Sequence, residues 1–74
     1  MKRYKGSVVI EKDAEGYFAF SPDLQGCYTH GDSYEEALEN IKDAIRLHLE
    51  DKIENNEPIP EIESISLTSL EVEV

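Results

Sequence analysis

The sequence contains no tryptophan, only one cysteine, and no long apolar run. A lone Cys27 excludes an internal disulfide bond, as is typical of proteins in a reducing compartment. The apolar run near the N-terminus, residues 8–10, has three members, whereas a signal peptide needs about 7–15 apolar residues and a membrane span about 20. We therefore expect a soluble, cytoplasmic protein without a membrane segment.

Positive charge is also scarce, with 7 Lys or Arg against 17 Asp or Glu and a formal charge of −10. A protein that grips nucleic-acid phosphates needs a basic stripe, so we expect no direct nucleic-acid binding. Residues 32–74 hold thirteen acids and three bases. Two interpretations remain open for them: a solvated face that maintains solubility, or a surface complementary to a basic partner.

A length of 74 residues predicts one small domain. A core of this size contributes only about 3–5 kcal/mol net. We therefore expect self-association, as a homodimer or a higher homo-oligomer.

Three strands are predicted in the first half of the chain, over residues 3–12, 17–21 and 27–30. Gly16 fits the turn between the first two strands, and Pro22 ends the second. In the second strand Tyr17 and Ala19 face one way, while Phe18 and Phe20 face the other. Apolar groups on both faces indicate a central strand, or a strand whose second face meets a partner.

The next segment predicts a helix over residues 33–55. Ser33 and Glu36 match a capping box, in which the hydroxyl accepts the Glu36 amide and the carboxylate accepts the Ser33 amide. Asn55 and Asn56, followed by Pro58, are typical of a helix end. An apolar stripe at helical spacing runs along the segment: Tyr34, Leu38, Ile41, Ile45, Leu49 and Ile53, widened by Ala37, Ala44 and His48.

Residues 61–74 predict one or two C-terminal strands, since Leu70, Val72 and Val74 alternate with glutamates. The order β-β-β-α-β indicates an α+β fold, with one long helix on one face of an antiparallel sheet. The apolar side of the last strand is a candidate homo-oligomer interface, because the strand can pair with a copy of itself and bury a free sheet edge.

No set of residues predicts catalysis, a metal site or a cofactor site. The candidate acids, Glu11, Asp13, Asp23 and Asp32, lack the convergent spacing of a two-metal nuclease. We interpret Asp23 as a turn residue and Asp32 as a helix-start residue. The remaining chemistry-bearing residues are interpreted as structural: Cys27 as a buried small side chain, His48 as a packed residue and His30 as structural or solvent-facing. No glycine-rich phosphate loop is present.

Three motifs, taken together, resemble the HicB-like antitoxin family: SPDLQGC at residues 21–27, GDSYEEALEN at 31–40 and PIP at 58–60. The resemblance spans residues 3 to about 62. It implies a partial RNase H-like fold and a partner, a small HicA-type toxin that has a double-stranded-RNA-binding-like fold and cleaves mRNA with a histidine. Many members add a C-terminal DNA-binding segment. Here the 14 residues after Pro60 are acidic and strand-like, so we expect a short form that does not bind operator DNA.

The sequence and the resemblance together predict an antitoxin-type binding protein, not an enzyme. In this hypothesis an acidic surface covers the basic RNA-binding surface of a HicA-like toxin. The residues expected near that contact are Asp23, Gln25, Glu39, Asp43 and Glu50. The alternative is a stand-alone homo-oligomeric regulatory or structural module with no toxin, assembled through Leu70, Val72 and Val74.

Overall fold

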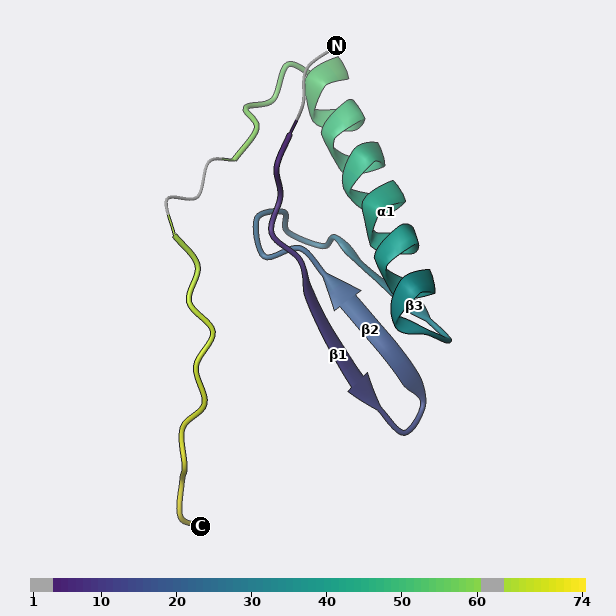
Figure 1. The fold of residues 1–74 in the computed structure, drawn as a ribbon. Helices are drawn as coiled ribbons and strands as arrows, with labels where there is room; N and C mark the ends of the chain where they lie inside the picture. Colours follow the sequence, from purple (N-terminus) through teal and green to yellow (C-terminus); the bar gives the residue numbers. More distant parts are fainter. Residues whose placement is uncertain (1–3, 61–63) are drawn as a thin grey trace.

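A computed structural model describes residues 4–60 and 64–74. It has three strands followed by one helix: β1 (Val9–Asp13), β2 (Gly16–Phe20), β3 (Tyr28–Gly31) and α1 (Tyr34–Glu54). The strands form an antiparallel sheet in the order β1-β2-β3, and α1 crosses one face of it (Figure 1). This arrangement confirms the predicted α+β class, with one long helix against an antiparallel sheet.

The first strand is shorter than predicted, since β1 begins at Val9 and not in the region of residue 3. Its first pair is Val9 with Phe20, the last residue of β2. Residues 4–8 therefore run beyond the end of their neighbouring strand, and the Ser7 amide donates to the Asp23 carboxylate at 3.0 Å in place of a strand partner. Residue 3, at which the predicted strand begins, lies outside the described residues.

The strand register assigns each side chain to one of two faces, because directly opposite residues project to the same side. One face carries the rows Ile10, Ala19, Thr29 and Lys12, Tyr17, Gly31. The other carries the rows Val9, Phe20, Tyr28 and Glu11, Phe18, His30. The first face is covered by α1, and β2 is the central strand, one of the two alternatives that its apolar pattern predicted.

Small side chains allow the two layers to approach closely. Ala19 in β2 and Ala37 in α1 are both fully buried. At the end of β3, a Cβ atom on Gly31 would lie only 2.5 Å from the Ala37 backbone nitrogen. The helix consequently packs chiefly against β3 and least against β1.

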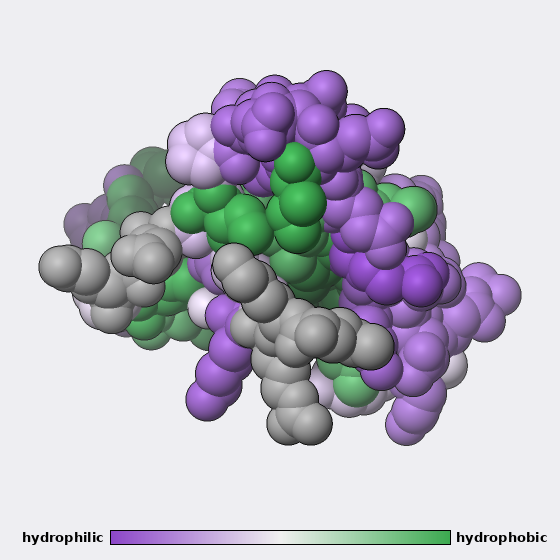
Figure 2. Space-filling model, turned by 90° about the horizontal axis from the view of Figure 1, so that it is seen from above, coloured by the Kyte–Doolittle hydropathy of each residue, from purple (hydrophilic) through white to green (hydrophobic). Residues whose placement is uncertain are grey.

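The core is completed by Leu24, Cys27 and Ile41. It uses only part of the predicted helical stripe, since Tyr34, Leu38 and Ile53 remain exposed. Seen end-on, hydrophobic residues gather in the middle of the molecule, and hydrophilic residues cover the outer side of the helix (Figure 2).

The start of α1 follows the predicted capping chemistry with one change. Ser33 has extended backbone angles, and its hydroxyl accepts the Glu36 amide at 3.1 Å. The Glu36 carboxylate reaches back to the Asp32 amide at 3.1 Å, one residue before the expected Ser33 amide. Asp32 therefore belongs to the start of the helix, as predicted.

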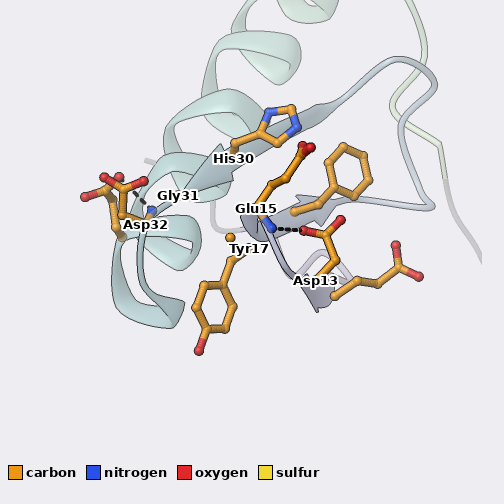
Figure 3. A pocket seen from close by; sticks show the side chains of 10 residues that line it. Asp13, Glu15, Tyr17, His30, Gly31 and Asp32 are labelled. Carbon is orange, nitrogen blue, oxygen red and sulfur yellow. Dashed lines mark hydrogen bonds between the residues drawn. The ribbon is translucent and has the colours of Figure 1, made fainter.

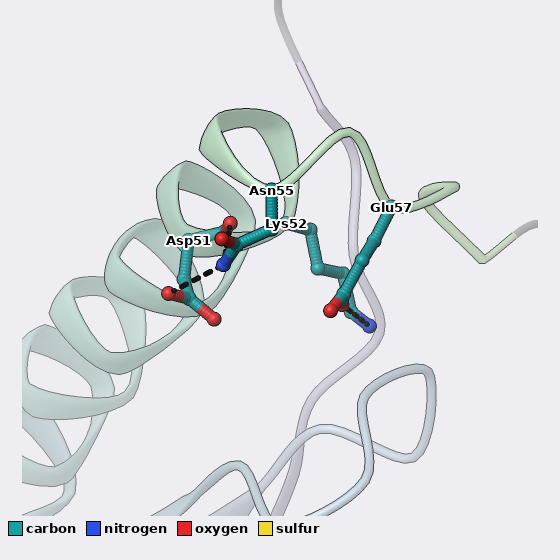
Figure 4. A network of polar contacts seen from close by, with 4 residues as sticks. All are labelled: Asp51, Lys52, Asn55 and Glu57. Atoms are coloured by element: carbon teal, nitrogen blue, oxygen red, sulfur yellow. Dashed lines mark hydrogen bonds and ion pairs between the residues drawn. The ribbon is translucent and has the colours of Figure 1, made fainter.

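The end of α1 is fixed by a small polar network (Figure 4). Asn55 donates from its backbone amide and from its side-chain amide to the Asp51 carbonyl, at 3.0 and 2.9 Å. The Lys52 ammonium lies 3.6 Å from a Glu57 carboxylate oxygen. Asn56 takes the left-handed conformation with φ of 56°, the role that asparagine often has after a helix.

The C-terminal segment does not form a strand within the single chain. Residues 64–74 are extended and exposed, run apart from the sheet (Figure 1), and carry no strand assignment. The strand predicted over residues 61–74 is therefore not formed over residues 64–74, and residues 61–63 lie outside the described residues. The physical reason is that a strand is defined by its pairing, and this segment has no paired neighbour among the described residues.

Replacing Gly31 with alanine tests the close approach of the two layers. The added methyl group overlaps the α1 backbone, so we expect Gly31→Ala to lower the free energy of unfolding by about 1–3 kcal/mol. Urea unfolding followed by circular dichroism measures the change. The control Gln25→Ala, at an exposed loop position, should stay within about 0.5 kcal/mol. Equal stability of the two variants would contradict the contact.

Replacing Ser33 tests the cap at the start of α1. Ser33→Ala removes the acceptor for the Glu36 amide and should cost about 1 kcal/mol of stability. Ser33→Asp keeps an acceptor at the same place and should retain most of that energy. Thermal and urea unfolding of both variants measure the difference, and a stable Ser33→Ala variant would show that the cap does not contribute.

Candidate functional site

Asp23, one of the residues predicted to contact a partner, accepts hydrogen bonds from other residues of this chain. It is half-buried, and its Oδ2 atom accepts the Ser7 amide at 3.0 Å and the Tyr4 hydroxyl at 3.4 Å. Burial and the neighbouring Asp23 carboxylate raise the pKa of the Tyr4 phenol above its ordinary value. Asp23 lies in the turn after β2, as its interpretation from the sequence requires, but the hydrogen bonds that it accepts come from the segment before β1 and are not the local ones of a turn residue.

The other predicted contact residues are exposed but do not form one cluster. Gln25 lies in the loop between β2 and β3, whereas Glu39, Asp43 and Glu50 lie along the outer side of α1. Asp43 pairs with Arg46 one turn later, at 3.1 Å. The helix therefore carries a string of carboxylates over its length, and the string faces away from the sheet.

A shallow pocket of about 370 Å³, lined by several carboxylates, lies at the end of the sheet that carries the β1–β2 hairpin. It lies where the β1–β2 hairpin, the end of β3 and the start of α1 meet, and the Glu15 side chain extends toward the side of His30 (Figure 3). Its lining includes no lysine or arginine. The acids that line it are Glu11, Asp13, Glu15, Asp32 and Glu36.

Two of these carboxylates already have structural roles. Asp13 accepts the Glu15 amide at 2.8 Å and so shapes the hairpin turn, and Glu36 accepts the Asp32 amide. Within residues 4–60 and 64–74, no three or more His, Cys, Asp or Glu are grouped to hold a metal ion. What the pocket provides is a concentration of negative charge at one end of the sheet.

An aromatic cluster lies on the open face of the sheet, next to this pocket. The Phe18 ring is central to it, with its centroid 5.8 Å from Phe20, 5.9 Å from Tyr28 and 5.2 Å from the imidazole of His30. Tyr28 is 59% exposed. The sequence identifies the two phenylalanines as a second apolar face, and the β2–β3 register places Tyr28 and His30 beside them on that face.

A second hollow, of about 340 Å³, lies on the helix side of the sheet. It runs between α1 and the segment before β1, where the helix covers the sheet least. Most of its lining is apolar: Tyr4, Gly6, Val8, Leu38, Ile41 and Ile45, with Glu39 and Lys42 beside them.

The remaining chemistry-bearing residues have the predicted structural environments. Cys27 is 2% exposed, and burial raises the pKa of its thiol, which disfavours the reactive thiolate. His48 is half-buried on the inner side of α1. In the described part of the chain, no helix has the length and hydropathy needed to cross a membrane.

Sequence comparison identifies several relatives. A UPF0150 protein from Helicobacter pylori is 64% identical over 45 residues, which cover 61% of this chain and 62% of the relative. A UPF0150 protein from Synechocystis is 45% identical over 58 residues, or 77% of this chain and 73% of the relative. Antitoxin HicB 1 from Photorhabdus laumondii is 41% identical over 61 residues, which cover 81% of this chain but only 39% of that longer protein.

The fold also matches a solved structure, a chain of a complex described as a HicA3 and HicB3 toxin-antitoxin complex. The match has a TM-score of 0.61 and 27% sequence identity, and it covers 76% of this chain and 65% of that one. The family profile described as "HicB_like antitoxin of bacterial toxin-antitoxin system" matches residues 7–73. The chain therefore belongs to the HicB-like antitoxin family.

Proposed function

We propose that this chain is a non-catalytic antitoxin that binds a small, basic HicA-like toxin and covers the toxin's RNA-binding surface. Family membership supports the antitoxin role, and the structural neighbour comes from a complex of an antitoxin with its toxin. A toxin that holds RNA must present positive charge to the phosphates, so its natural competitor is an acidic protein.

The observation that carries the proposal is the exposed negative charge of the surface. The formal charge is −10, and exposed carboxylates follow α1 along its outer side, among them Glu39, Asp43 and Glu50. A field of one sign raises the rate at which an oppositely charged protein associates. These helix carboxylates and Asp23 supply part of the negative field that attracts the toxin, and Gln25, a neutral exposed residue in the same loop as Asp23, is proposed to lie near the contact.

A binding titration at increasing salt tests this electrostatic mechanism. Because salt screens charges between proteins, we expect the affinity for a HicA-like toxin to fall by at least about tenfold from low to high ionic strength, mainly through slower association. The toxin is used with its catalytic histidine replaced. An affinity that does not change with salt would contradict the mechanism.

The C-terminal segment favours a second candidate function, that of a homo-oligomeric module. Leu70 and Val72 are 84% and 74% exposed in the single chain, and they alternate with Glu71 and Glu73. An extended segment with one apolar side and an unpaired backbone is suited to pairing with a second copy. This function is compatible with toxin binding, because the two use different parts of the chain.

Truncation after Ser64 tests the second candidate. We expect the full chain to be a homodimer or larger, and the truncated chain to give monomers or aggregates in light scattering coupled to size-exclusion chromatography. Leu70→Ser with Val72→Ser should have the same effect, whereas Glu71→Gln with Glu73→Gln, on the opposite side of the segment, should not. An unchanged oligomer after truncation would remove this candidate.

A further inference from the structure

The open face of the sheet is built like the centre of a protein interface. The register places two aromatic rows on it, and α1 covers only the opposite face. Phe18 contacts Phe20, Tyr28 and His30 at ring-centroid distances of 5.2–5.9 Å. Within residues 4–60 and 64–74, no helix or strand lies over this cluster.

The cluster is partly exposed to water, since Tyr28 and His30 are exposed while Phe18 and Phe20 are half-buried. An apolar patch left in water on a small soluble protein commonly marks a contact site, and aromatic residues are enriched among those that contribute most to binding energy. Tyr28 combines a 59% exposed ring with a hydroxyl group, which suits a site that is wet in the free protein and buried in a complex.

The charge around the cluster indicates which occupant fits. The adjoining pocket is lined by Glu11, Asp13 and Glu15 from the hairpin, with no lysine or arginine in its lining. A second copy of this chain stacked face to face would place these carboxylates near identical ones, and like charges at an interface are repulsive. A basic protein would meet them with opposite charge, around an apolar centre, the usual anatomy of a specific interface.

We propose that the open face of the sheet is the surface on which the basic toxin docks, with Phe18, Phe20, Tyr28 and His30 as its apolar centre and Glu11, Asp13 and Glu15 as its negative rim. This inference rests on the proposed antitoxin function and names the face of the molecule that binds the toxin. The carboxylates on the outer side of α1 lie on the other side of the molecule. They attract the toxin at long range and do not contact it.

Two substitutions on the open face test the proposal with the full chain and a HicA-like toxin whose catalytic histidine is replaced. Tyr28→Ala should weaken binding at least tenfold through faster dissociation, because it removes an aromatic anchor. Glu15→Lys should slow association at low salt, because it reverses a rim charge. The matched control is Leu47→Ala on α1, at a residue that is 61% exposed, and it should leave the affinity within twofold. Glu39→Lys probes the alternative docking face, the outer side of α1: it should slow association, because it reverses an attracting charge, but leave the dissociation rate within twofold.

Circular dichroism and thermal unfolding confirm that each variant is folded, and light scattering reports its oligomeric state. If the toxin binds Tyr28→Ala as tightly as the wild type while Glu39→Lys dissociates faster, the docking face is the helix and the inference is wrong, although the antitoxin function stands. If Tyr28→Ala only dissociates a homo-oligomer, the open face joins copies of this chain, which also overturns the inference. If the wild-type chain does not bind the toxin at all, the proposed function fails first.

Discussion

The contact between the start of α1 and the end of β3 determines how the rest of the molecule is arranged. Gly31 has no side chain where the Ala37 backbone passes, and the buried Ala19 lies on the same face of the sheet. Helix and sheet can therefore lie close together over β2 and β3. The helix then covers β1 least. Among the described residues no helix or strand lies over the opposite face of the sheet, where Tyr28 and His30 are exposed and Phe18 and Phe20 are half-buried.

The open face of the sheet and the negative surface are the two features on which the proposed binding function rests. The carboxylates of the hairpin end are partly engaged in the backbone, through Asp13 at the turn and Glu36 at the helix start. Those along α1 point into solvent. In the proposed function the charge brings a basic toxin to the molecule, and the aromatic cluster around Phe18 supplies the apolar contact that holds it.

The sequence predicted the features that depend on neighbouring residues. Ser33 and Asn56 act within one turn of the helix ends, and the apolar groups on both sides of β2 indicated a central strand. Features that depend on distant pairing were not predictable. Asp23 accepts the amide of Ser7, which lies 16 residues earlier, and Tyr28 joins Phe18 only once β3 is in register. Residues 64–74 alternate as a strand should, but alternation does not provide the second strand with which they would pair.

The inhibition of RNA cleavage tests the central claim most directly. A HicA-like toxin is purified in active form, and its cleavage of an mRNA is followed as this chain is added. The account predicts that cleavage stops as the two proteins reach equal concentration. Undiminished cleavage in the presence of excess chain would contradict it, even if the two proteins were found to bind each other.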